Sequence, residues 1–365
     1  MVLNKLINIC ITIIILFIIF SSFANIPILV AIGVIAIVVL CMYKFNLKNK
    51  IFLIIFILIS LLTKLLCFVL IETPLESDFK TLYDISQDLL DGKLNQSSNT
   101  YLKEYPYQAP YVIYQSLLLK ICNNLNFLKI VNIFICVLID LLIYLIAKRI
   151  SSEKSARTIS LLYVLFAFPT IYITVITNQF ISTLLMLLGI LVLFNTKLEN
   201  RKVLKYICCG ILIGLSNLMR PEAVITVIAI LCYIIKNMII NKEIKKNIVI
   251  IVSFLLTYII ITTGTMGILK QINLIPKDSR ADLLWKFVCG LNYESKGRWN
   301  SEDLNLIYNN NLTYEERTQL EKELIAQRLD ELPNHIYTFK DKIKIYWSNF
   351  EYVWSFNYLN AQGNY

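Results

Sequence analysis

The chain has 365 residues, of which 57% are apolar and only 16% are charged, and its formal net charge is +10. The mean hydropathy is +0.64. Soluble domains are closer to half apolar and a quarter charged, so this composition excludes a disordered chain and argues strongly against a water-soluble enzyme. The nine cysteines form no Cys-x-x-Cys motif and lie mostly in apolar runs, which argues against a zinc or redox site.

Long apolar runs predict a membrane protein built from transmembrane helices. Runs of about 18 or more residues with few charges are long enough to cross a bilayer. We place spans at residues 6–24, 26–43, 51–71, 127–147, 156–174, 178–195, 203–219, 221–236 and 248–270. A tenth apolar and aromatic stretch begins near Ile345. The first run also resembles a cleavable signal peptide, although we favour an uncleaved span.

The predicted fold class is therefore an all-α polytopic membrane protein with about nine to ten transmembrane helices, outward-facing loop helices and a small outer domain. Residues 1–270 form the transmembrane domain, which includes an outer loop at 72–126. Residues 271–344 form an outer, soluble-like segment. Residues 345–365 begin a further membrane-spanning or interfacial helix.

The distribution of charge predicts how the chain is oriented. Four short loops, at residues 44–50, 148–157, 197–205 and 236–246, each carry a net charge of +3. The two long loops, 72–126 and 271–344, carry net charges of −3 and −1. Short loops rich in lysine and arginine stay in the cytoplasm, so the long loops face outward, across a bacterial cytoplasmic membrane. The positive charge is thus an orientation signal, and we expect no nucleic-acid partner.

The first long loop opens with an acidic motif, Glu76-Ser77-Asp78. Residues 79–90 follow with apolar side chains on one face and acidic ones on the other, which predicts an amphipathic helix along the outer membrane surface. Asp78 lies in the first turn of this helix, at the outer end of the third span. Its carboxylate either only stabilises the helix N-terminus or serves a reaction at the headgroup level.

Tyrosines dominate the next part of this loop, at Tyr101, Tyr105, Tyr107, Tyr111 and Tyr114. Pro110 fits the start of a second short helix, over 111–121. These rings form either an aromatic belt at the membrane interface or a platform for a sugar or a prenyl chain.

Of the charged residues that lie at or inside predicted spans, three are candidates for a specific role. Arg220 occupies a very short outer turn, just before Pro221, where its guanidinium either marks the interface or pairs with a phosphate. Lys64 and Asp140 lie within spans, and intramembrane charges are functional candidates by default. Snorkelling explains Lys64 equally well, and a structural partner is the better explanation of Asp140.

The second long loop is the only soluble-like part of the chain. Residues 285–303 are rich in turn, polar and aromatic residues, and they include Trp299 and Asp303. A charged helix follows at 314–332, with Thr313 as its N-cap and Glu316 three residues later.

Taken together, these motifs resemble the GT-C class of glycosyltransferases, and most of all the family 39-like membrane transferases, which include protein O-mannosyltransferases and lipid A aminoarabinose transferases. The resemblance covers most of residues 51–356 and depends on the order of the motifs and their shared outer side. They are Pro74-Leu75-Glu76-Ser77-Asp78-Phe79, Tyr105-Pro106-Tyr107-Gln108, Leu218-Met219-Arg220-Pro221 and the stretch from Gly290 to Asp303.

The resemblance implies an inverting transfer of a sugar from a polyprenyl-phosphate donor to an unidentified envelope acceptor, in contact with membrane lipid. It implies that Asp78 is the general base and that Arg220 holds the donor phosphate, with Lys64 as a second phosphate contact. Residues that position the acceptor or substrate would be Glu76, Tyr105, Tyr107, Gln108, Trp299 and Asp303.

Two departures from the family pattern stand out. Many members have a second carboxylate in the next outer turn, where this chain has Asn178 and Gln179, so a divalent metal is only weakly supported and no metal ligand is assigned. Many members also have further spans after the outer domain.

The alternatives to a transferase are a lipid or polysaccharide flippase or transporter, a polysaccharide polymerase and a non-catalytic scaffold.

Overall fold

The computed structural model describes residues 47–335, except 93, 95, 166, 283, 296, 298 and 309–311. The predicted spans 6–24 and 26–43 and the stretch that begins at Ile345 lie outside the described residues. The described part divides after Arg280 into two compact units. Within the described ranges every regular element is a helix.

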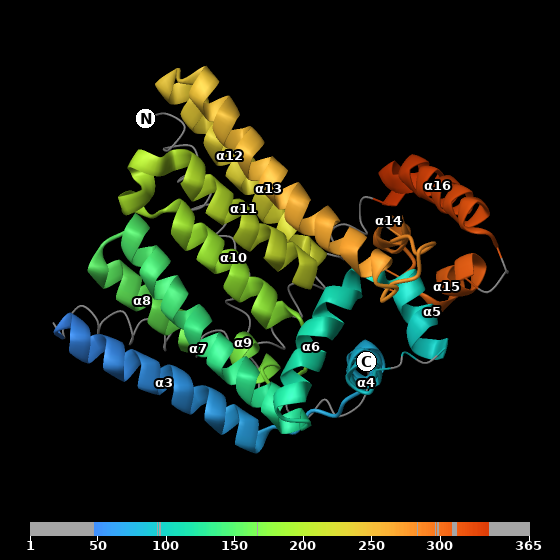
Figure 1. Ribbon diagram of the computed structural model, residues 1–365, viewed down its shortest axis with the longest axis horizontal. Helices are drawn as coiled ribbons and strands as arrows, with labels where there is room; N and C mark the ends of the chain where they lie inside the picture. Colours follow the sequence, from blue (N-terminus) through green and yellow to red (C-terminus); the bar gives the residue numbers. More distant parts are fainter. Residues whose placement is uncertain are drawn as a thin grey trace. The chain divides into compact units, whose positions relative to one another are not determined.

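The first unit holds most of the helices (Figure 1). They are α3 (Asn49–Leu70), α4 (Ser77–Leu90), α5 (Gln96–Glu104), η1 (Pro106–Gln108), α6 (Ala109–Ile121), α7 (Leu125–Ile150), α8 (Glu153–Leu165), α9 (Ala167–Tyr172), α10 (Gln179–Leu193), η2 (Thr196–Arg201), α11 (Lys202–Met219), η3 (Pro221–Ala223), α12 (Val224–Asn241) and α13 (Ile244–Gln271). The second unit holds α14 (Trp285–Leu291), α15 (Ser301–Tyr308), α16 (Tyr314–Glu331) and η4 (Leu332–His335).

Five helices of the described chain are long and apolar enough to cross a membrane, which confirms an all-α polytopic membrane protein. They are Asn49–Leu70, Leu125–Ile150, Thr196–Met219, Pro221–Ile240 and Ile244–Gln271. The apolar helix Gln179–Leu193 is shorter. The sequence run 156–174, predicted as one span, is divided between α8 and α9. Pro169 has no backbone N–H to donate to the carbonyl of Leu165, where α8 ends.

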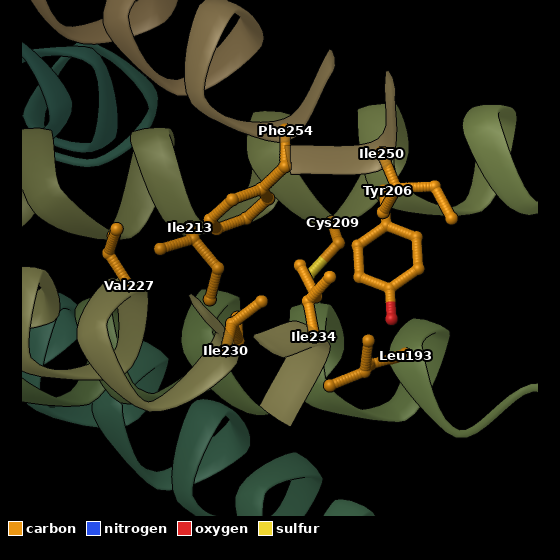
Figure 2. Close-up of a cluster of buried hydrophobic side chains, with 9 residues drawn as sticks. All are labelled: Leu193, Tyr206, Cys209, Ile213, Val227, Ile230, Ile234, Ile250 and Phe254. Atoms are coloured by element: carbon orange, nitrogen blue, oxygen red, sulfur yellow. The ribbon is translucent and has the colours of Figure 1, made fainter. Parts of the chain in front are cut away.

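The long helices of the first unit lie side by side. Figure 1 shows α11 between α10 and α13, and α7 between α10 and α3. Nine buried side chains of α10, α11, α12 and α13 form one apolar cluster, with Phe254 and Ile213 at its centre (Figure 2). Packing between these helices therefore holds α11 at fixed distance from both of its neighbours.

Glycine allows α11 to approach α13 closely. A Cβ atom at Gly210 would lie 2.8 Å from the backbone carbonyl oxygen of Phe254. A Cβ atom at Gly214, one turn later, would lie 2.9 Å from side-chain carbons of Ile261. Small residues four apart are a common basis of tight helix packing in membranes.

Two serines join α10 to α11. The Ser182 and Ser216 hydroxyls are 3.0 Å apart, and each hydroxyl also donates to the other residue's backbone carbonyl, at 3.0 and 2.8 Å. Asn178 lies four residues before Ser182, and Arg220 lies four residues after Ser216. Because four residues make about one helical turn, this antiparallel contact brings Asn178 and Arg220 to the same end of the two helices.

The amphipathic helix expected at 79–90 is present as α4 and packs against α6. Its buried residues Leu82 and Ile85 belong to an apolar cluster with Tyr111 and Val112 of α6. The Ser86 hydroxyl donates to Gln115 at 2.8 Å across the same contact. This contact fixes the start of α4, where the acidic motif lies.

Candidate functional site

The acidic motif lies at the junction between an extended segment and α4. Glu76 is the N-cap residue in the extended region, and Ser77 has a φ of 54°, which is unusual for a residue other than glycine. Asp78 follows in the first helical turn, and both acidic side chains are exposed. Among the described residues neither carboxylate makes a hydrogen bond or ion pair, so both are open to a bound molecule or to water.

The segment before this motif is anchored to two other elements. The Thr73 hydroxyl donates to the carbonyl of Thr174 at 2.6 Å. Lys129 of α7, which is 7% exposed, donates to the carbonyl of Thr73 at 3.5 Å. These residues line a small cavity together with Pro74, Leu75, Phe79, Leu125, Val175 and Ile176. Sequence reasoning missed Lys129, because neither its spacing nor its neighbours distinguish it from an interfacial lysine.

Three tyrosines form a cluster of rings, and one of them, Tyr101, is close enough to Asp78 to be affected by its charge. The rings of Tyr101 and Tyr105 have centroids 5.0 Å apart, and those of Tyr105 and Tyr107 meet edge to face at 6.2 Å. Burial raises the pKa of Tyr101 above its ordinary value, and the negative charge of Asp78 raises it further, with smaller effects of Tyr107 and Tyr105. The carboxylate and this tyrosine cluster therefore share one electrostatic environment.

Tyr101 was named with the other tyrosines of this loop but was not among the predicted site residues. It lies on α5, four residues before Tyr105, and this spacing is a further signal that the two rings lie on the same side.

A chain of polar side chains continues from Tyr107. The next residue, Gln108, accepts a hydrogen bond from the Asn178 amide at 3.3 Å. The Asn178 carbonyl oxygen accepts one from Nη1 of Arg220 at 3.2 Å. Asn178 thus connects two predicted site residues, Gln108 and Arg220. In the sequence, Asn178 stood out only because many family members have a carboxylate in this turn.

Arg220 is held on one side and open on the other. It caps the C-terminus of α11 in extended conformation, and its Nε donates to the exposed carboxylate of Glu222. Its side chain is 33% exposed. In the part of the chain that the structure describes, Nη2 makes no hydrogen bond. A guanidinium with such a free edge can donate to a phosphate oxygen.

Lys64, predicted as a second phosphate contact, has a partner within the helices. It is 1% exposed, and its ammonium lies 2.5 Å from the Asp140 carboxylate. The Ser60 hydroxyl donates to the same carboxylate at 2.6 Å. This buried pair joins α3 to α7 and accounts for both intramembrane charges, so snorkelling does not describe Lys64. A phosphate contact would require this pair to open.

Trp299 and Asp303 belong to the second unit. Trp299 is 62% exposed, whereas Asp303 is buried and accepts hydrogen bonds from Arg328 at 2.7 and 3.1 Å and from Asn292 at 2.8 Å. Asn292 also accepts from the backbone N–H of Ser295 at 2.9 Å. Asp303 thus holds α14, α15 and α16 together, a structural task that its sequence motif did not reveal.

No metal centre is built by the described residues: none of their histidine, cysteine, aspartate and glutamate side chains form a group of three or more suited to an ion. The arrangement of the first unit offers instead an exposed carboxylate, a tyrosine cluster and an arginine with a free edge. Such a set can accept a proton, support a sugar ring and bind a phosphate.

Comparison with known proteins gives a match to one family over part of the chain. The pattern of the dolichyl-phosphate-mannose-protein mannosyltransferase family matches residues 106–264. The matched region runs from η1 to α13 and contains Tyr107, Gln108, Asn178 and Arg220, while Asp78 precedes it. No curated protein and no solved structure matches the chain. The fold and this match define a membrane protein similar to GT-C glycosyltransferases, and the likeness is to the mannosyltransferase type.

Proposed function

We propose that this protein moves a sugar from a polyprenyl-phosphate donor to an acceptor at the outer face of a bacterial cytoplasmic membrane. The observation that carries the proposal is the linkage of separate sequence motifs at one end of the first unit. Gln108 is joined to Arg220 through Asn178, and the charge of Asp78 acts on Tyr101, whose ring lies against that of Tyr105.

In this proposal Asp78 is the general base. An acceptor hydroxyl gives its proton to the carboxylate while its oxygen forms a bond to the anomeric carbon of the sugar. The bond from that carbon to the phosphate oxygen breaks, and attack from the opposite side inverts the configuration. A carboxylate that is exposed and unpaired within the described chain suits this role, because an acceptor hydroxyl can reach it.

Arg220 holds the leaving group. The lipid phosphate gains charge as the bond breaks, and a guanidinium fixed in place stabilises that charge without reorganising. The tyrosines Tyr105 and Tyr107, with Gln108, provide rings and an amide for the sugar or the acceptor, and Glu76 lies beside the base. The acceptor and the identity of the sugar are to be found by experiment.

The test is sugar transfer by the purified protein. Labelled polyprenyl-phosphate hexoses are incubated with a membrane extract, and the component that becomes labelled is identified. We expect Asp78→Asn to reduce transfer by about 100-fold or more, which is the usual size of a general-base contribution. Asp84→Asn is the matched control, because Asp84 is an exposed carboxylate on the same helix.

Other outcomes would reject the proposal in distinct ways. Equal transfer by the Asp78→Asn variant and the wild-type protein would remove Asp78 as base. Flux of a lipid-linked sugar across vesicles, without transfer, would indicate a flippase or transporter. Lengthening of a lipid-linked oligosaccharide would indicate a polymerase.

A further inference from the structure

Asn178 occupies a central position between three polar groups. It is 8% exposed and precedes the first residue of α10. Its Nδ2 donates to the carbonyl of Met219 at 2.8 Å and to the side-chain oxygen of Gln108 at 3.3 Å, and its Oδ1 accepts from Arg220 at 3.2 Å. Both N–H groups of its amide and one lone pair of its oxygen thus bond to groups of the candidate site or to the backbone beside it.

The Met219 carbonyl determines which way this amide points. A backbone carbonyl can only accept, so the NH₂ group must face it, and the oxygen must then face the guanidinium. A carboxylate at this position would direct an oxygen at the Met219 carbonyl, where two acceptors repel. The hydrogen bonds therefore require an amide at position 178.

An amide also has a consequence for charge. An amide orients the guanidinium through a dipole and adds no charge beside it. One carboxylate, Glu222, already binds Nε from the exposed side, so Arg220 and Glu222 together have no net charge. A second carboxylate, at position 178, would make this group net negative and would repel an anion from the free edge of Arg220.

We propose that Asn178 is a positioning residue that holds Arg220 toward a phosphate group without placing a second negative charge beside the guanidinium. The proposal rests on the proposed function for the source of that phosphate, a polyprenyl phosphate. The proposal assigns the Asn178 amide a role in affinity for the donor. A carboxylate at position 178 would repel the donor phosphate, in addition to any effect on packing.

The direct test measures binding of polyprenyl phosphate without a sugar, to the full-length protein in nanodiscs of zwitterionic lipid. We expect Asn178→Asp to weaken this binding about tenfold or more, as expected for the loss of a charge-assisted contact. In a transfer assay the donor KM should rise and the acceptor KM should stay unchanged. Gln179→Glu is the matched control, because it adds the same charge at the adjacent position and should change binding less than about twofold.

A double variant separates charge from structure. Asn178→Asp combined with Glu222→Gln restores the wild-type number of carboxylates beside Arg220, so binding should partly recover. A merely structural role of Asn178 predicts no recovery, because Glu222→Gln repairs no contact to Met219 or Gln108. Unchanged polyprenyl-phosphate binding by a folded Asn178→Asp variant would overturn the proposal.

The two proposals fail separately. If the wild-type protein binds polyprenyl phosphate but transfers no sugar, the proposed function fails while the role of Asn178 is still measured by binding. Competition by inorganic phosphate at equal potency would show that the site recognises a free phosphate rather than a lipid-borne one, which would overturn the polyprenyl assignment. Thermal unfolding of each variant checks that a loss of binding is not a loss of fold.

Discussion

At the scale of single residues, buried charges in the helices are distinguished from charges at the site by their partners. Lys64 and Asp140 form a pair inside the helices, with Ser60 as a third member. Arg220 is partly exposed and keeps a free edge among the described residues. Arg220 and Lys64 were both predicted as phosphate contacts. Their surroundings distinguish them, because Lys64 is buried in an ion pair and Arg220 is partly exposed.

Replacing Lys64 alone should destabilise the protein. Lys64→Met leaves the Asp140 carboxylate without its counter-charge, and removal of one partner from a buried pair costs about 3–5 kcal/mol. Replacing both, as Lys64→Met with Asp140→Leu, should recover most of the loss, because an apolar pair needs no compensation. Thermal unfolding in detergent measures the stabilities.

The same double variant tests the phosphate role of Lys64. If Lys64 serves only the helix pair, the donor KM of the double variant stays near the wild-type value. A large increase in donor KM with restored stability would instead support Lys64 as a phosphate contact.

At the scale of elements, the contact between α11 and α13 depends on a missing side chain. Gly210→Ala places a methyl group against the carbonyl of Phe254, which belongs to the backbone and cannot move alone. We expect a loss of about 1–3 kcal/mol, as for overpacked cores. Gly264→Ala is the control, because nothing lies within 4 Å of its Cβ position. Equal stability of the two variants would show that the helices separate easily.

The second unit contains a buried carboxyl group with a pH-dependent role. Glu321 of α16 is 1% exposed, and one of its oxygens has no hydrogen-bond partner among the described residues. Burial raises the pKa of Glu321 to about 8, and the neighbouring Asp282 carboxyl raises it too, while Arg317 opposes the shift. The folded unit therefore favours the protonated form.

Stability of the second unit should fall as the pH rises. Below the ordinary pKa of 4.5 the contribution of Glu321 is fully present, and it is lost as the pH passes about 8. The slope between these values is at most about 1.4 kcal/mol per pH unit. This slope can be measured by hydrogen exchange of α14 to α16 in the full-length protein, after correction for the pH dependence of the intrinsic exchange rates. Glu321→Gln should flatten this dependence, and the exposed Glu323→Gln should leave it unchanged.

At the scale of the whole molecule, the charge distribution makes a prediction about sidedness. Cys122 is exposed between α6 and α7, in the loop predicted to face outward. With the other cysteines replaced by alanine, a membrane-impermeant maleimide should label Cys122 on intact cells. Asn200→Cys, in the basic loop of η2, should be labelled only after the membrane is opened. The reverse pattern would place the candidate site on the cytoplasmic side.

The sequence predicted the long helices well because each one depends on a local apolar run. The span placed at 203–219 is α11, Lys202–Met219, and Arg220 lies at its end as expected. Hydropathy alone missed the break between α8 and α9 and did not predict α5, whose nine residues have no apolar face. Short polar helices depend on tertiary contacts, which no local pattern records.

Some residues of the candidate site were named from the sequence, but the contacts that join them were not. Asp78, Gln108 and Arg220 were each named from the sequence, yet the link through Asn178 depends on how α10 and α11 pack. Ser182 and Ser216 set that packing, and serines inside apolar helices are too common to signal a contact. The pairing of Lys64 with Asp140 was missed for the same reason, since 76 residues separate the two.

The separation of Lys64 and Asp140 along the sequence has a consequence for insertion of the chain into the membrane. Ribosomes synthesise the chain from its N-terminus, so α3 reaches the membrane insertion machinery before the counter-ion of Lys64 has been translated. An unpaired ammonium near the bilayer centre costs about 2.5–3.5 kcal/mol on insertion scales. The other residues of α3 are apolar enough to carry this cost during insertion, and pairing with Asp140 relieves it once α7 has entered the membrane.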